Sequence, residues 1–145
     1  MGIKCKTSSA EIEEYFDQRV KAIRQAQINN LVYVGEAAVK EARESGRYKD
    51  QTGNLRSSIG YCVLDNGKVI KESSFDVVKE GGQGSTEGRE FLHRLISEHS
   101  KGLALIIVAG MNYAAYVEAK NYNVLDSAEQ MAERLLPQLL KELSV

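Results

Sequence analysis

"NLRSSIGYCVLDNGKVIKESSFDVV", residues 54 to 78, holds two runs rich in β-branched and aromatic residues on either side of a turn sequence. This pattern is typical of a β-hairpin. A two- or four-residue loop would scatter the apolar residues, whereas the three-residue loop Asp65-Asn66-Gly67 gathers them on one face and puts Gly67 at the left-handed position. The register on that face is Leu55 with Val77, Ile59 with Ser73, and Val63 with Val69, joined by Phe75. The stretch therefore predicts an antiparallel sheet with one buried face.

A long helix is expected before the hairpin, from a cap at Ser8 or Ser9 to about Ser45, with Gly46 as its stop. Its apolar stripe is interrupted only by Gln27. At about 1.5 Å per residue such a helix is roughly 50 Å long, more than a compact domain of this size spans. It must bend or project, and a projecting helix needs a partner for its stripe. The stripe consists of Ile12, Phe16, Val20, Ile23, Leu31, Val34, Ala38 and Ala42.

The rest of the chain predicts an α+β domain, with helices packed on a small antiparallel sheet. "EGGQGSTEG" is expected to be a flexible loop before a short helix capped by Ser85 or Thr86. "LALIIVAG", residues 103 to 110, is apolar on both faces and predicts a central strand. Asp126 and Glu129 predict a capping box for the last helix, which Pro137 should kink. The expected segments of this single domain, 1–145, are a long helix at 8–45, a hairpin at 53–79, a loop and helix insertion at 80–101, and a central strand, short helical turn and C-terminal helix at 102–145.

Bulk properties exclude several classes of protein. The 145 residues are 43% hydrophobic and 27% charged, as expected for one globular domain. The formal net charge of −1 gives no basic footprint for nucleic acid. No run approaches the roughly 18 apolar residues of a membrane span, and the N-terminus turns acidic where a signal peptide needs an apolar core. Cys5 and Cys62 have no histidine nearby and predict free thiols in a reducing compartment rather than a metal site.

Two features could belong to an enzyme. Tyr116 and Lys120 form Y-x-x-x-K, and three glycines lie between a strand and a helix, which gives a faint similarity to a short-chain dehydrogenase. The glycine spacing is one residue longer than G-x-G-x-x-G, and no acidic residue ends the next strand to hold a ribose. Because of these two departures, a nucleotide- or dinucleotide-binding enzyme is kept only as the alternative function. We expect no catalytic residue, cofactor or metal. The glycines are Gly82, Gly84 and Gly88.

Two segments together resemble a known family. "TGNLRSSI", residues 52 to 59, is similar to the T-G-x-L-R-x-S-I segment of small tail-completion or head–tail joining proteins of long-tailed bacteriophages. "NYAAYVEAK", residues 112 to 120, resembles the Y-A-x-Y-V-E segment of the same family, which also follows an apolar strand. Ala119 and Lys120 stand where the family usually has Gly-Thr, "NVLDSA" replaces a segment with Pro-Phe, and residues 81–99 look like an insertion.

This resemblance implies a structural virion protein of a phage or prophage, without catalysis. Its partners would be further copies of itself, in a ring around the DNA channel, and other neck or tail proteins, with DNA only as passing cargo. It would reside in the host cytoplasm during assembly and then in the virion neck or tail. A host-encoded interaction module is a third class. The motif residues, which are also candidates for an interface, are Thr52, Gly53, Leu55, Arg56, Ser57, Tyr113, Ala114, Tyr116, Val117 and Glu118. Of these, Tyr113, Tyr116 and Val117 are expected on one packing face, with Glu118 free for a cap or an inter-subunit contact.

Overall fold

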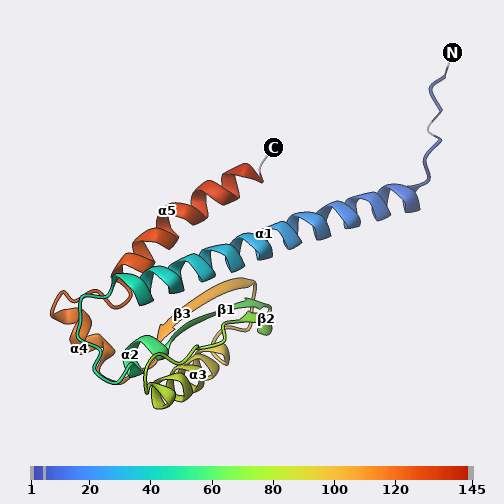
Figure 1. The fold of residues 1–145 in the computed structure, drawn as a ribbon. Helices are drawn as coiled ribbons and strands as arrows, with labels where there is room; N and C mark the ends of the chain where they lie inside the picture. The colour runs from blue at the N-terminus through green and yellow to red at the C-terminus, as the bar shows by residue number, and fades with distance from the viewer. Residues whose placement is uncertain (1, 5, 144–145) are drawn as a thin grey trace.

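The fold is α+β, with a three-stranded antiparallel sheet of order β2-β1-β3 lying between helices (Figure 1). This computed structural model describes residues 2–4 and 6–143, so the thiol predicted at Cys5 lies outside the described residues. Helices α1 and α5 pack on one face of the sheet and α3 on the other. In chain order the elements are α1 (Ser9–Ser45), α2 (Asn54–Ser57), β1 (Ile59–Asp65), β2 (Lys68–Glu72), α3 (Gly82–Ile96), β3 (Leu103–Ala109), α4 (Ala114–Ala119) and α5 (Asp126–Glu142).

Helix α1 has the predicted start and length. The Ser8 hydroxyl accepts a hydrogen bond from the Glu11 amide at 3.2 Å, and the Glu11 carboxylate accepts one from the Ser8 amide at 3.2 Å, which completes a capping box. Only the C-terminal part of the helix is packed, because burial begins at Ile28 and every residue from Ser9 to Ile23 is exposed. The helix therefore projects from the body of the molecule (Figure 1).

The hairpin forms, but its predicted register is wrong. Asn66 and Gly67 alone make the loop, with φ of 51° and 81°, as a two-residue type I′ turn requires. Val63 pairs with Lys71 instead of Val69, because the shorter loop and a bulge between Val63 and Leu64 each shift the register. The three-residue loop would collect apolar residues on one face, whereas β1 is buried on both faces and β2 is largely exposed.

Both ends of the predicted hairpin leave the sheet. Leu55 lies in the helical turn α2, so the expected pair with Val77 does not form. Ser73 bonds to Tyr61 instead of facing Ile59: its amide donates to the Tyr61 carbonyl at 2.9 Å, and its hydroxyl accepts from the Tyr61 amide at 2.9 Å. Phe75 adopts a positive φ of 52° and packs on the opposite face of the sheet from Ile59.

The central strand is β1, and the prediction that residues 103–110 form the central strand is wrong. β3 pairs with β1 from Ile59 opposite Ala109 to Asp65 opposite Leu103, and its other edge has no strand beside it within the described chain. Its residues are apolar on both faces because helices cover both faces of the sheet. Those on the α1 side are only half-buried.

The segment predicted as a flexible glycine loop is the start of α3. Gly84 and Gly88 let the helix backbone approach its neighbours closely: a Cβ on Gly88 would lie 2.8 Å from the Ser58 Cα. The Gly84 amide donates to Asn54 Oδ1 at 2.9 Å, which fixes the helix start. α3 buries Leu92 against the second face of the sheet, so one side of this helix, within the 80–101 segment, belongs to the core.

Cys62 lies on that second face and is fully buried. Burial raises the pKa of its thiol to about 11, with a smaller contribution from Glu72. Because the thiolate is the reactive form, we expect no reaction with Ellman's reagent at pH 8 in the folded Cys5→Ser chain and full reaction after unfolding. Rapid labelling of the folded variant would contradict this packing of α3.

Candidate assembly surface

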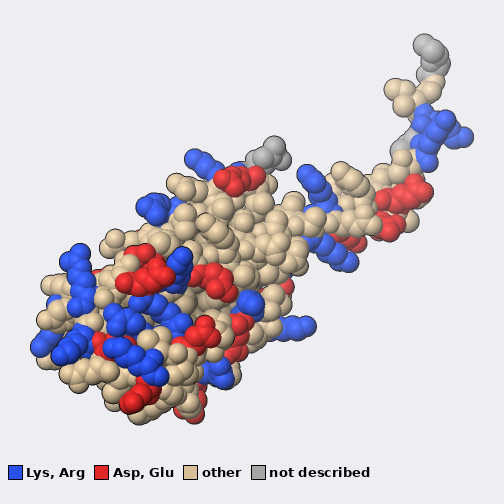
Figure 2. Space-filling view, in the orientation of Figure 1, with Lys and Arg blue, Asp and Glu red and all other residues tan. Residues whose placement is uncertain are grey.

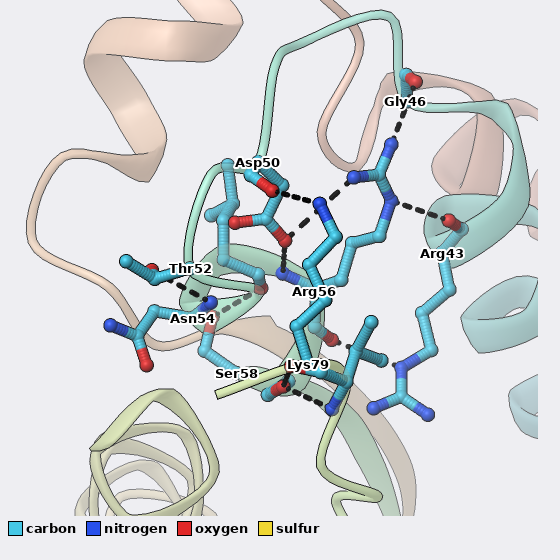
Figure 3. A network of polar contacts seen from close by, with 11 residues as sticks. Arg43, Gly46, Asp50, Thr52, Asn54, Arg56, Ser58 and Lys79 are labelled. Carbon is cyan, nitrogen blue, oxygen red and sulfur yellow. Dashed lines mark hydrogen bonds and ion pairs between the residues drawn. The ribbon is translucent and has the colours of Figure 1, made fainter. Parts of the chain in front are cut away.

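Arg56, from the first motif segment, joins α2 to the end of α1 (Figure 3). Its guanidinium donates to the Arg43 carbonyl at 3.0 Å and the Gly46 carbonyl at 3.2 Å, groups that the helix end leaves without intrahelical partners. Arg43 returns a bond from Nε to the Arg56 carbonyl at 3.0 Å. Arg56 also stacks over the Tyr48 ring, 4.7 Å from its centroid. A positive charge at a helix C-terminus is favourable, so Arg56 acts as a cap.

Asp50 is a buried carboxylate that the sequence did not single out. It accepts a hydrogen bond from the Arg56 amide at 3.0 Å and lies 3.7 Å from the Arg56 guanidinium, while its carbonyl accepts from Lys79 Nζ at 2.6 Å (Figure 3). Thr52 accepts from the Asn54 amide at 3.4 Å. The sequence indicates no more than a polar loop for "GRYKDQTG", because the partners of this segment are mostly backbone atoms.

The other residues of the first segment are also used inside the chain. Ser57 Oγ accepts from the Val78 amide at 2.8 Å, and Gly53 holds a φ of 80° with the Val78 carbonyl packed against it. Leu55 and Ser57 are buried. These residues therefore form an internal joint, and their surface for a partner is small.

The structure brings the two motif segments together. Leu55 from the first and Ala114 from the second lie in one buried cluster, with Val117 packed against it. Tyr48, Met111 and Val124 complete the cluster. Burial raises the pKa of the Tyr48 phenol to about 12. The β1–β3 pairing supplies the connection, because it places the end of β3 beside the start of β1.

Glu118 caps the start of α5. Its carboxylate accepts hydrogen bonds from the backbone amides of Val124, Leu125 and Asp126, the last two at 3.2 and 2.7 Å. Of the two roles expected for Glu118, the structure thus contains the cap. The capping box predicted from Asp126 and Glu129 does not form, because Asp126 is already inside the helix and the N-cap is Leu125.

Replacement of this cap tests its importance. Glu118→Gln removes the charge that the amides share and turns an NH₂ group toward one of them, so we expect a loss of about 1–3 kcal/mol in the free energy of unfolding by urea. Glu129→Gln is the matched control and should change it by less than about 0.5 kcal/mol. A greater loss of stability from Glu129→Gln would indicate that Glu129 also caps α5, as the predicted capping box requires.

The second segment is only partly packed. Val117 contacts the buried cluster, but Tyr113 and Tyr116 are exposed, so the single packing face expected for the three residues is wrong. Lys120 Nζ lies 4.5 Å from the centroid of the Tyr116 ring, a cation–π contact on the surface. The two tyrosines are the motif residues with the most surface for a partner.

Comparison with family models, with curated proteins and with solved structures finds no significant match to this chain. Among the described residues, no helix is long and apolar enough to cross a membrane, and no group of three or more His, Cys, Asp or Glu is placed to hold a metal ion.

The largest unpacked feature is the free part of α1, from Ser9 to Ile23, which we call the arm. It stands out from the body in Figure 2, with acidic side chains near its outer end and basic ones nearer the body. At its base, Arg24 Nε donates to Asp65 Oδ2 at 3.2 Å, and this bond lowers the pKa of the Asp65 carboxyl. One side of the arm carries large exposed apolar side chains, here called the stripe: Ile12, Tyr15, Phe16, Val20 and Ile23.

A second apolar surface lies on the body, in a groove of about 760 Å³ between α5 and β3. From β3 it is lined by Leu103, Leu105 and Ile107, all half-buried. From α5 it is lined by Ala132, Leu136 and Leu140. Ala128 is the only residue of α5 that is fully buried, although the helix has an extended apolar face. The groove and the stripe are two extended apolar surfaces that packing within this chain leaves uncovered.

Proposed function

We propose that this chain is a structural protein of the head–tail junction or tail end of a phage or prophage. It acts in virion assembly as a tail-completion or head–tail joining component, through ring-like association of identical copies. It performs no catalysis and needs no cofactor. Its partners are copies of itself and other neck or tail proteins, first in the host cytoplasm and then in the virion, and DNA passes through the assembly as cargo.

The observation that carries this proposal is the arm. Soluble monomers rarely expose long contiguous apolar surface, and such patches mark sites of association. From Ser9 to Ile23 the helix is exposed at every residue, yet one side of it carries the aromatic and aliphatic side chains of the stripe. A helix of this kind, projecting from a small folded body, suits a protein whose role is to hold other subunits.

The direction toward a virion comes from the resemblance of the two motif segments. Leu55 and Ala114 contribute to one buried cluster, so the segments behave as one structural unit, as a family signature would. The formal net charge of −1 is compatible with a ring that lets DNA pass without gripping it.

The nucleotide-binding alternative has weaker support. It needs glycine amides that face an open site, whereas Gly84 and Gly88 lie within α3 against Asn54 and Ser58. Thermal unfolding with added nucleotides separates the two functions. We expect no shift, and a saturable rise of several degrees in the melting temperature would favour the enzyme.

Deletion of the gene from the phage or prophage that carries it tests the proposed function. Electron micrographs of the induced lysate should show DNA-filled heads and tails that fail to join, or tails with an abnormal end. Supply of the intact chain from a plasmid should restore complete particles. Normal, infectious particles from the deletion strain would contradict the proposal.

A further inference from the structure

We propose that the arm of one copy docks into the groove between α5 and β3 of the next copy. This inference rests on the proposed self-association and names the surfaces that perform it. The contact joins two different surfaces, so each copy presents one arm and one groove. Such a heterologous contact builds a ring when its rotation closes, whereas an arm-to-arm contact would end at a dimer.

The two surfaces match in length and in apolar character. The arm spans 15 residues, Ser9 to Ile23, which is about 22 Å of helix, and α5 with 17 residues is about 26 Å long. The stripe offers aromatic and aliphatic side chains, and the groove offers half-buried or exposed aliphatic ones from α5 and β3. The docked arm would be a third helix on the face of the sheet that packs against α1 and α5. It would cover Leu105 and Ile107, which are half-buried there.

Charge selects the orientation. The arm begins acidic, with Glu11 in its first turn, and carries Arg19 between the apolar positions of the stripe. The groove is acidic on the first part of α5, at Glu129 and Glu133. The last turn of α5 carries one basic and one acidic residue, Lys141 and Glu142. An antiparallel arm brings Arg19 to the acidic part and keeps Glu11 at the far end of α5, away from Glu129 and Glu133. A parallel arm would put its acidic turns against Glu129 and Glu133.

One antiparallel register satisfies these pairings at the same time. It sets Ile12 opposite Leu140, Phe16 opposite Leu136, Arg19 opposite Glu133, and Val20 opposite Ala132. Residues three and four apart lie on the same side of a helix, and the spacing along the arm repeats in reverse along α5. The large Val20 side chain then faces the small Ala132, as close packing of two helices requires.

Two variants test the contact. The stripe-blocked chain carries Phe16→Asp and Val20→Asp, both at exposed positions of the arm. The groove-blocked chain carries Ala132→Lys and Leu140→Lys, which put charged side chains opposite the apolar Val20 and Ile12 of the arm. Matched controls place the same changes on the other side of each helix: Gln18→Asp with Gln25→Asp, and Gln130→Lys with Gln138→Lys. Circular dichroism and thermal melting are the checks that all four chains fold like the wild type.

The masses in solution are read by light scattering. We expect assemblies from the wild type and both controls, monomers from each blocked chain alone, and a 1:1 dimer from their equimolar mixture. The mixture stops at a dimer because the groove-blocked chain has only its stripe and the stripe-blocked chain has only its groove. One contact between them uses both surfaces. Assembly of the groove-blocked chain alone would mean that stripes pair with each other, and assembly of the stripe-blocked chain would place the contact elsewhere. Either result, or a mixture that stays monomeric, overturns the docking.

The charge pair gives an independent check within this mixed dimer. Arg19→Glu in the groove-blocked chain, which donates the arm, should weaken the dimer by roughly tenfold, and Glu133→Lys in the stripe-blocked chain should recover most of the loss. Failure of the recovery would reject the antiparallel register. If the wild type assembles but the mixed dimer does not form, the docking is rejected and the proposed function is not. If the mixed dimer forms but the deletion strain yields normal particles, the proposed function is rejected and the docking is not.

Discussion

Ile59→Asp should abolish the folded state. The side chain is 1% exposed and lies between β3 and α1, next to Tyr61 and Val63 in the main cluster. An unpaired carboxylate there loses its hydration and displaces apolar contacts, at a cost of more than about 4 kcal/mol. The total stability of a domain is about 5–15 kcal/mol, and near the lower end of this range such a cost leaves no stable fold. We expect no cooperative thermal transition and a circular dichroism spectrum of reduced amplitude.

The matched control is Ile70→Asp in the neighbouring strand β2, where the side chain is 42% exposed. It should melt cooperatively, with a free energy of unfolding within about 1 kcal/mol of that of the wild type. Leu55→Asp, at a position 2% exposed in the cluster that joins the motif segments, should behave like Ile59→Asp. Soluble Ile59→Asp protein with a cooperative transition would mean that the face of β1 toward α1 has been misassigned.

Gly88→Ala should also destabilise the fold, although alanine is the better helix former. The added methyl group would lie 2.5 Å from the Ser58 carbonyl oxygen and 2.9 Å from the Phe75 ring. The backbone of Gly110 also packs against Gly88, so α3 must move away from the sheet to make room. Such overpacking costs about 1–3 kcal/mol or more, against a gain of about 1 kcal/mol in helix propensity. We expect a melting temperature several degrees lower.

Gly82→Ala separates crowding from helix propensity. Gly82 lies in the same helix, and a Cβ there meets nothing within 4 Å. The free energy of unfolding of this variant should exceed that of the wild type by no more than about 0.5 kcal/mol. Equal effects of the two substitutions would contradict the close approach of α3 to β1 and β3.

The long helix shows what the sequence could predict. The Ser8–Glu11 capping box and the spacing of apolar residues give its bounds almost to the residue. They do not say where it leaves the body, because Ile12 and Phe16 continue the same stripe as the buried Leu31 and Val34. The pattern of a helix face is the same whether the face meets its own sheet or another chain.

The hairpin shows where patterning fails. Asn66-Gly67 is a strong signal for a two-residue turn. The predicted register instead followed the expectation that all apolar residues lie on one face of the hairpin. Tyr61 faces α1 while Cys62 faces α3, and both are fully buried, so alternation along β1 carries little information. The prediction missed the second face because the segment that covers it, α3, begins with glycines that resemble a loop.

The candidate site was predictable only in part. Leu55, Arg56 and Glu118 belong to the motif segments and can be singled out from the sequence alone. The partners of Arg56 and Glu118 are mostly backbone groups, however, and these leave no mark in a sequence. The groove was also invisible, because it depends on half-burial of β3 residues that read as core. Its complement on the arm was visible as an apolar stripe on a helix too long for the domain.

Light scattering on the intact chain at increasing concentration tests the central claim, that copies associate through the arm. We expect the mass to rise from 16.1 kDa to a defined multiple, and the chain with Phe16→Asp and Val20→Asp to remain at 16.1 kDa while still melting cooperatively. A wild-type chain that stays at 16.1 kDa at every concentration, or a variant that assembles equally well, would contradict the claim.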